Sequence, residues 1–300
     1  MKLLKRSLVL LGCALAAAAA FTACELELGN NDDRKETADS ENPAEVTVPD
    51  PAAAYALDGT DDGVKIEGNG SFVEDNTFGT GKVFKNDDTA QRTSYLLLPK
   101  DTLQHSAESK EMTIGFWVNA NGATNLWNPL FSAYAAAPSK NEDSNRAEEV
   151  PLVNGVPMFI LQSRCQVQVN IGGEPAIWCD FIEAQKDFAV SSYGGSDKIW
   201  NVGYNDWKDN DWHYYTCTMT EKSAVIYIDG EKIVSWTIDG TTINGSVNGI
   251  FQVDTLTYVC LGGNQAWDWG DADAPYSFAK FSVWDTALNE EQIKSVVAAK

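Results

Sequence analysis

Histidine is nearly absent from this sequence of 300 residues, where only His105 and His213 occur. Two imidazoles cannot build a three-histidine metal centre. The sequence shows no Ser-His-Asp arrangement, no glycine-rich phosphate loop and no Cys-x-x-Cys pair. His213 follows Trp212 in a strand-like run, where packing at a strand edge is its expected role. Zinc chemistry and triad hydrolysis are therefore poorly supported.

Basic residues are also scarce. The chain has 22 Lys and Arg against 43 Asp and Glu, which gives a formal net charge of −21. Such a surface repels nucleic acid and anionic lipid, so neither is an expected partner. It is compatible with neutral glycans, with cations, or simply with solubility.

Long apolar runs are missing except near the N-terminus. There Lys2, Lys5 and Arg6 precede the apolar stretch Leu8–Ala20, which is too short to span a bilayer. Residues 1–23 are therefore predicted to be a signal peptide. Ala23-Cys24 at its end resembles the lipobox of bacterial lipoproteins, in which the cysteine is acylated. The alternative is ordinary secretion, with cleavage near Ala20 or Ala23.

Residues 24–50 are predicted to be an acylated Cys24 followed by a disordered acidic tether. Residues 25–50 hold nine acids, two bases and two prolines, with almost no large apolar side chains. This composition cannot bury enough surface to fold. An acidic run after the lipid-bearing cysteine resembles surface-export signals of some Bacteroidetes lipoproteins. We therefore expect the protein at the cell envelope, in the outer membrane and at the cell surface, with the lipid as its only membrane contact.

The rest of the chain, residues 51–300, has the pattern of short strands and turns. Residues 112–118 and 213–219 alternate between apolar and polar side chains with period two. Asp229-Gly230 between two apolar runs predicts a hairpin with a type I′ turn. One helix is predicted at Asn289–Ala298, with Asn289 as its N-cap. Together these features predict an all-β, two-sheet antiparallel jelly-roll sandwich with a short C-terminal helix.

A series of motifs in this region resembles laminin G-like domains of the concanavalin A-like lectin/glucanase superfamily. The matches run in order along the chain: Tyr55-Ala56-Leu57-Asp58-Gly59, Met112–Val118, Asp211-Trp212-His213, Ile226-Tyr227-Ile228-Asp229-Gly230, Leu261-Gly262-Gly263 and Phe281–Leu288. The resemblance implies the same sandwich fold. One departure is Ala279-Lys280, where the family often has an acidic pair.

Glycoside hydrolases on this fold use two carboxylates at neighbouring positions of one strand, in a pattern such as Glu-x-Asp-x-x-Glu. That pattern is absent. Asp180-Phe181-Ile182-Glu183 and the acids in 268–273 are the nearest strings, and neither has the register. No catalytic residue is therefore predicted.

Calcium is the ion that the resemblance implies, because such modules often hold one Ca²⁺ with Asp or Asn oxygens. Asp58, Asp61 and Asp62 are the predicted ligands by position, and Asp271 with Asp273 forms a second acidic cluster. The alternative is that these are solvated turn residues.

Tryptophans in probable loops are the remaining functional signal. Sugar rings stack their C–H faces on aromatic rings, while Asp and Asn bind the hydroxyls. Tryptophans in strand-like runs are more typical of packing. The predicted carbohydrate-binding residues are Trp127, Trp178, Trp200, Trp207, Trp267 and Trp269.

Four cysteines follow the tether. Cys165 and Cys179 flank Gly172-Gly173, a predicted hairpin turn, and could face each other; Cys217 and Cys260 lie in β-rich segments. Export permits disulfides, but a domain of this size does not need them, so free buried thiols are expected.

Three functions fit these features. The first is an envelope-anchored, non-catalytic carbohydrate-binding module whose partner is a glycan or polysaccharide. The second is a divergent glycoside hydrolase or polysaccharide lyase on the same fold. The third is a protein-binding adhesion or structural surface module. The first is the leading hypothesis.

Overall fold

The computed structural model describes residues 46–86, 94–104, 106–123, 128–134, 158–170, 177–179, 206–237, 251, 256–262 and 275–300. They belong to one compact unit, Glu45–Lys300, which is distinct from Met1–Ala44. In the described ranges no helix is long and apolar enough to cross a membrane.

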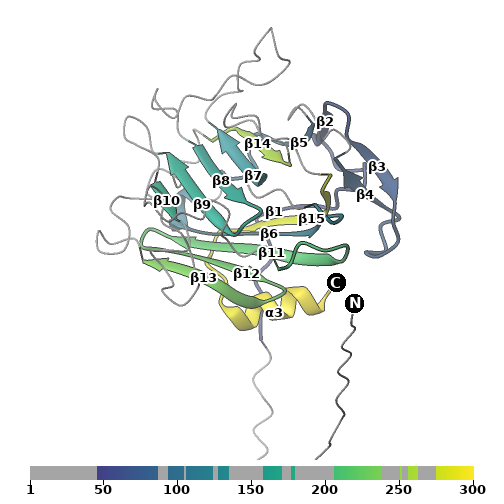
Figure 1. Ribbon diagram of the computed structural model, residues 1–300. Coiled ribbons are helices and arrows are strands. Elements are labelled where there is room, and N and C mark those ends of the chain that lie inside the picture. Colours follow the sequence, from purple (N-terminus) through teal and green to yellow (C-terminus); the bar gives the residue numbers. More distant parts are fainter. Residues whose placement is uncertain are drawn as a thin grey trace, which may run out of the picture. The chain divides into compact units, whose positions relative to one another are not determined.

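Two antiparallel sheets stack face to face in this unit (Figure 1). In the described part, one sheet has eight strands in the order β13-β12-β11-β6-β15-β4-β3, with β1 added beside β15. Its strands are β1 (Ala53–Tyr55), β3 (Ser71–Glu74), β4 (Lys82–Lys85), β6 (Glu111–Asn119), β11 (Trp212–Thr220), β12 (Ser223–Ile228), β13 (Glu231–Thr237) and β15 (Ser277–Trp284).

The second sheet has seven described strands in the order β10-β9-β8-β7-β14-β5-β2. Its strands are β2 (Lys65–Glu67), β5 (Tyr95–Leu98), β7 (Pro129–Tyr134), β8 (Met158–Gln162), β9 (Gln166–Asn170), β10 (Ile177–Cys179) and β14 (Tyr258–Leu261). A one-turn helix α1 (Ser106–Ser109) precedes β6, and α3 (Glu290–Ala298) follows β15. The predicted two-sheet sandwich with a C-terminal helix is confirmed.

The core lies between the two sheets, and aromatic rings from both sheets meet there. Phe116 of β6 stacks on Tyr215 of β11 with ring centroids 5.5 Å apart, and Phe131 of β7 stacks on Phe281 of β15 at 5.7 Å. Stacked rings of this kind add to the free energy of burying their surface. The alternation predicted for residues 112–118 therefore places one face of β6 in the core.

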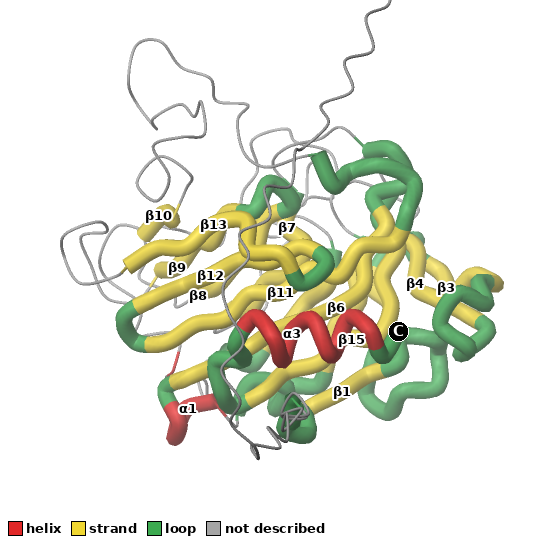
Figure 2. The backbone as a smooth tube through the Cα atoms, turned by 90° about the horizontal axis from the view of Figure 1, so that it is seen from below, coloured by secondary structure: helices red, strands yellow, loops and turns green. Residues whose placement is uncertain are grey.

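The opposite face of β6 is buried as well, because α3 lies against the outer face of the eight-stranded sheet (Figure 2). Asn289 caps α3: its side chain accepts a hydrogen bond from the Gln292 backbone N–H, and the Gln292 side chain accepts one from Asn289. This reciprocal capping box fixes where the helix starts.

The hairpin predicted at Asp229-Gly230 joins β12 and β13. Both turn residues have positive φ, 54° at Asp229 and 83° at Gly230, as a type I′ turn requires. The Asp229 carboxylate also accepts a hydrogen bond from the Tyr214 backbone N–H. The turn is therefore tied to the neighbouring strand β11.

The domain begins earlier than the sequence predicted. The Thr47 carbonyl accepts a hydrogen bond from Gln292 Nε2 at 3.0 Å, and the Pro49 carbonyl accepts one from Trp284 Nε1 at 2.9 Å. Val48 packs between them against the cluster under α3. Residues 47–49, assigned to the tether by their composition, are therefore part of the folded unit.

Three of the four cysteines are described with their side chains: Cys165 and Cys260 are free and buried as expected, and Cys217 is buried. Cys179 pairs in register with Val167 across the predicted hairpin, and its side chain lies outside the described part. Cys165 stands in the turn before β9 with φ of 60°, so it is not opposite Cys179. Burial raises the pKa of the Cys165 and Cys260 thiols, which makes them poor nucleophiles.

Candidate functional site

A groove of about 400 Å³ opens beside the β3–β4 hairpin, and we call it the β3–β4 groove. One wall is the loop that follows β1, and the other is the hairpin itself. The groove is lined by Asp58, Gly59, Thr60, Phe72, Glu74, Thr80, Gly81 and Lys82.

The loop after β1 is shaped by one carboxylate. Asp61 accepts hydrogen bonds from the backbone N–H groups of Ala56 and Leu57, at 2.8 and 2.7 Å. Leu57 adopts a positive φ of 61° while its side chain is fully buried in the core. These contacts turn the chain sharply, so that Asp58 and Gly59 project beside the hairpin.

Phe72 forms the apolar floor of the groove. The ring is half-buried and packs edge-on against Phe84, with centroids 6.0 Å apart. Gly59 lies directly against it, since a Cβ atom at Gly59 would come within 3.1 Å of the Phe72 ring. A glycine is needed here both for this close approach and for its φ of 94°. The remaining surface of the Phe72 ring lines the groove.

Polar groups surround this ring. Asp58 accepts hydrogen bonds from the Thr60 backbone N–H and hydroxyl, at 2.9 and 2.6 Å. The hydrogen bond from the Thr60 hydroxyl is the main cause that lowers the pKa of Asp58. Across the groove, Glu74 pairs with Lys82 at 3.9 Å. The groove therefore offers ionised acceptors, an ammonium donor and hydroxyls around an aromatic face, which is the chemistry that binds sugar hydroxyls and C–H groups.

Asp58 is poorly suited to act as the general acid of a glycoside hydrolase. A general acid must keep a proton near neutral pH, usually in apolar surroundings that raise its pKa. The lowered pKa of Asp58 is the opposite of that requirement. Glu111, the one carboxylate in β6, accepts hydrogen bonds from Thr286 and Ala287 and so serves the turn before α3.

The predicted calcium ligands do not form a cation cage. Asp61 uses both carboxylate oxygens on backbone N–H groups, Asp58 is engaged by Thr60, and Asp62 is exposed. Among the described residues no three His, Cys, Asp or Glu side chains form a group that could hold a metal ion. Asp271 and Asp273 lie outside the described ranges.

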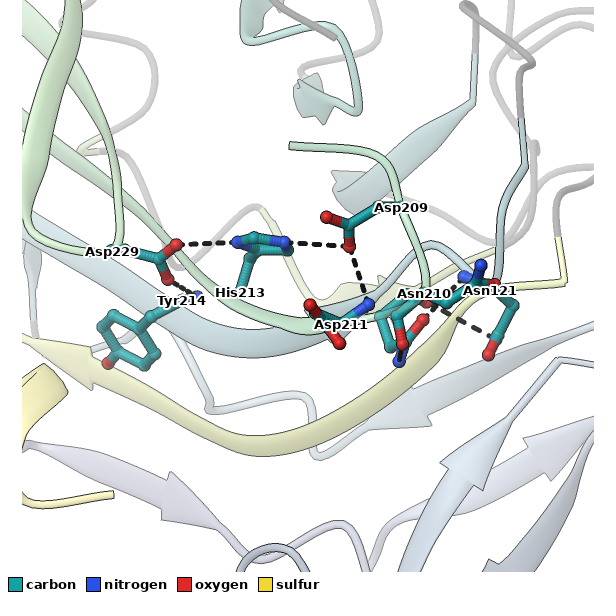
Figure 3. A network of polar contacts seen from close by, with 8 residues as sticks. Asn121, Asp209, Asn210, Asp211, His213, Tyr214 and Asp229 are labelled. Carbon is teal, nitrogen blue, oxygen red and sulfur yellow. Dashed lines mark hydrogen bonds and ion pairs between the residues drawn. The ribbon is translucent and has the colours of Figure 1, made fainter. Parts of the chain in front are cut away.

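A second polar cluster joins the loop before β11 to the β12–β13 turn through His213 (Figure 3). His213 lies between two carboxylates: Nδ1 is 2.7 Å from Asp229 and Nε2 is 3.1 Å from Asp209. The two ring nitrogens point to different acids, so the three groups do not converge on one ion. Asn119 Nδ2 donates to the Asn210 carbonyl, and the Gly122 N–H donates to the Asp209 carbonyl. This network holds the loop 206–211 against the end of β6.

The segments that carry most of the predicted sugar-binding tryptophans start or end beside this network. Asn121, which precedes the segment with Trp127, donates to the Pro275 carbonyl, and Pro275 follows the segment with Trp267 and Trp269. Trp127, Trp200, Trp267 and Trp269 themselves lie outside the described residues. Trp178 lies in β10 opposite Gln168, and its side chain is likewise outside the described part.

The prediction that Trp207 binds carbohydrate is corrected by its burial. The side chain is only 2% exposed, and its Nε1 donates a hydrogen bond to the Ser163 carbonyl at 2.9 Å. The ring also packs edge-on against His213 and Tyr215. The loop around it is polar, but the ring is turned inward and joins the loop to the β8–β9 turn. Trp207 therefore offers no face to a sugar.

The His213 network predicts a pH effect on stability. The hydrogen bond with Asp229, followed by that with Asp209, raises the pKa of His213 above its usual 6.5. The folded state thus binds this proton more tightly than the unfolded state. The contribution is fully present below about pH 6.5 and is lost as the pH rises through the higher folded-state pKa.

We therefore expect His213→Asn to cost about 0.5–1 kcal/mol more at pH 5.5 than at pH 9, because partly exposed ion pairs contribute on this scale. Urea unfolding of both proteins at the two pH values measures it. Lys208 also titrates between these pH values, because burial lowers its pKa to about 7. Both proteins contain Lys208, so its contribution cancels when their unfolding free energies are subtracted. An equal cost at both pH values would contradict the predicted pH effect.

Phe72, Glu74 and Thr80 of the groove are not among the residues predicted from the sequence, which are tryptophans and acids. A signal was available: Gly79 and Gly81 are typical of a turn, and Phe72 and Glu74 are two residues apart and so share one face of the strand before it. What the sequence could not show is that the loop at Asp58 packs beside this hairpin.

Residues 87–294 match the family model described as the concanavalin A-like lectin/glucanases superfamily. Curated protein sequences give no match.

Solved structures show weaker likenesses. The binding domain of Botulinum neurotoxin DC in complex with rat synaptotagmin II has 15% identity and a TM-score of 0.46 over 79% of this chain and 47% of that one. Domain 4 of AbnA, a GH43 extracellular arabinanase from Geobacillus stearothermophilus in complex with arabinotriose, has 14% identity and a TM-score of 0.48. That likeness covers 84% of this chain and all of the other. This chain thus spans about half the length of the neurotoxin chains it matches.

The family model covers well over half of the sequence and includes the β6, β11 and β12 motifs that form the centre of the eight-stranded sheet. This chain therefore belongs to the concanavalin A-like lectin/glucanases superfamily.

Proposed function

We propose that this protein is a non-catalytic carbohydrate-binding module, and that the β3–β4 groove holds the glycan. The observation that carries the proposal is the half-buried Phe72 ring surrounded by Asp58, Thr60, Glu74 and Thr80. A sugar ring would stack on Phe72, and its hydroxyls would donate to the two carboxylates. Because the groove is open and polar, the fit favours part of a longer chain over a fully enclosed small molecule.

In this proposal the N-terminal region determines where in the cell the module is held. Acylation of Cys24 would hold the protein at the cell envelope, in the outer membrane and facing outward. The acidic tether would let the domain move away from the lipid surface. The strongly negative charge disfavours adhesion to anionic lipid and leaves the domain free to retain extracellular glycan.

A hydrolase or lyase is the second candidate, because Asp58 and Glu74 are two carboxylates that line one groove. The lowered pKa of Asp58 argues against a role as general acid. The two candidates differ in whether the bound glycan is cleaved.

A glycan-array screen of the purified protein, paired with a reducing-end release assay, tests the proposal. We expect binding to at least one neutral glycan and no release of reducing ends. Release of reducing ends would mean that the protein is a hydrolase or lyase and not a non-catalytic binding module. Binding to no glycan would leave the protein-binding module as the better account.

Calcium is tested in the same screen with a chelator. The acids around the groove are engaged with Thr60, Lys82 and backbone groups, so we expect glycan binding in the groove to persist without the ion. Loss of all glycan binding on chelation would mean that binding depends on calcium held by residues other than these.

A further inference from the structure

The β3–β4 groove carries an imbalance of charge that narrows the class of sugar it fits. It lies beside the hairpin that ends the eight-stranded sheet (Figure 1). Asp58 and Glu74 stand on its two walls, and Lys82 is the one cation among the described residues that line it. One positive and two negative groups leave the groove with a net negative charge. The whole chain carries −21, so the field of the protein also favours a cation.

Lys82 does not cancel the charge of Glu74 through a tight contact. The ammonium nitrogen lies 3.9 Å from the carboxylate, and the two side chains are 50% and 80% exposed. Exposed pairs of this kind are weak and are screened by salt. The Thr60 hydroxyl is the main cause that lowers the pKa of Asp58, and Lys82 adds a smaller effect. Lys82 is therefore shared between two acids, and neither acid is fully paired.

The directions of the hydrogen bonds give the groove a second bias. The Thr60 hydroxyl donates its proton to Asp58 Oδ1, and the Thr80 hydroxyl donates to the Lys82 carbonyl at 2.9 Å. A hydroxyl has one proton, so both threonines present only lone pairs to a ligand. Both hydrogen bonds from Thr60 to Asp58 end on Oδ1, which leaves Oδ2 for a ligand. Among the described side chains that line the groove, Lys82 alone can still donate, and the other polar ones accept.

The Phe72 ring adds a third preference. Its exposed part lines the groove between the two acids and the threonines. An aromatic face attracts a cation placed over it, and this attraction adds to that of the carboxylates. A protonated amine has three donors and one positive charge. One such group therefore matches the acceptors, the net charge and the ring of this groove.

We propose that the glycan held in the β3–β4 groove is an amino sugar whose amine is free. This inference rests on the proposed function and names the class of sugar for the same groove. The ammonium lies between Asp58 and Glu74 at the Phe72 ring, while ring hydroxyls donate to the two threonines. An N-acetyl group fits less well, because it is uncharged and adds a carbonyl to a groove of acceptors. A uronic acid fits worst, because it adds a further carboxylate.

Three matched tetrasaccharides test this inference in the purified protein. The β-1,4-linked tetramers of glucosamine, glucose and N-acetylglucosamine share one backbone and differ at C2. At about pH 5.5 the amine is protonated, and we expect the glucosamine tetramer to bind about tenfold more tightly than the glucose tetramer. The N-acetyl tetramer should bind no more tightly than glucose. At about pH 9 the sugar amine is neutral, so the preference should disappear. Shifts of the Asp58, Thr60 and Phe72 amides show that binding occurs in the groove.

Two variants should move this preference in opposite directions. Glu74→Gln removes the surplus negative charge of the groove and should reduce the preference for glucosamine about threefold. Lys82→Gln doubles the surplus and should increase the preference by a similar factor, about threefold. Both side chains are at least half exposed, so both variants should fold. Glu108→Gln removes an exposed acid of α1 that does not line the groove, and this control should leave the preference unchanged.

Equal affinity of the glucosamine and glucose tetramers at about pH 5.5 would overturn the inference and leave the proposed function intact, provided that both shift the groove amides. Absence of groove shifts with the glucosamine tetramer would also overturn it. The proposed function itself fails only when no glycan shifts these amides. An equal loss of preference in Glu108→Gln and Glu74→Gln would mean that the overall charge of the protein attracts the amine, which contradicts a role of the groove. Tetralysine supplies charge without a sugar ring, and equally tight binding of this peptide in the groove would overturn the assignment of a sugar.

Discussion

Replacing Trp207 with alanine is expected to lower the free energy of unfolding by about 3–5 kcal/mol, the usual cost of removing a buried tryptophan. The ring fills space between loop 206–211 and the β8–β9 turn, and its N–H bonds the Ser163 carbonyl. Deletion leaves both a cavity and a buried carbonyl without its donor. Urea unfolding should show a lower midpoint with an unchanged slope.

Trp207→Phe is the matched control, because it keeps an aromatic ring but loses the hydrogen bond. We expect it to be clearly less destabilising than Trp207→Ala. Glycan affinity of the folded fraction should be unaffected in both variants. A stable Trp207→Ala protein that no longer binds glycan would mean that this ring faces the ligand, as the sequence had suggested.

Replacing Phe72 with leucine is expected to weaken glycan binding about fivefold, because stacking on an aromatic face contributes on the order of 1 kcal/mol beyond simple burial. Leucine keeps most of the packing against Phe84, so stability should fall by less than about 1.5 kcal/mol. Isothermal titration with a glycan found in the array measures the affinity. Thermal unfolding of the same samples measures the stability.

Phe72→Tyr is the companion variant, since it retains the aromatic face. Its affinity should lie within about twofold of the original protein. If leucine and tyrosine behave alike, Phe72 acts only as packing and the groove has no stacking platform.

Local chemistry made much of the fold predictable. The Asp229-Gly230 turn, the Asn289 cap and the alternation in residues 112–118 each depend on neighbours in sequence. Strand β7 shows where this fails: every residue of Pro129–Tyr134 is buried, so the strand has no alternation to detect. Burial on both faces depends on which strands and layers surround β7 in the fold. The local sequence pattern does not reveal those neighbours.

The candidate site was harder to predict for the same reason. Asp58 and Phe72 are distant in sequence, and they meet because Asp61 turns the loop by binding backbone N–H groups. Sequence position made Asp61 look like a cation ligand, whereas its oxygens are used within the loop. Trp207 stands among polar residues, yet the loop packs against the β8–β9 turn and buries the ring. The polarity of the residues next to Trp207 in sequence therefore did not predict whether its ring is exposed.

The β3–β4 groove is the proposed glycan site. Amide chemical-shift mapping with a glycan identified in the array tests this site. We expect the largest shifts to fall on Asp58, Gly59, Phe72 and Thr80. Large shifts confined to residues around His213 and Asn121, with none in the groove, would contradict it.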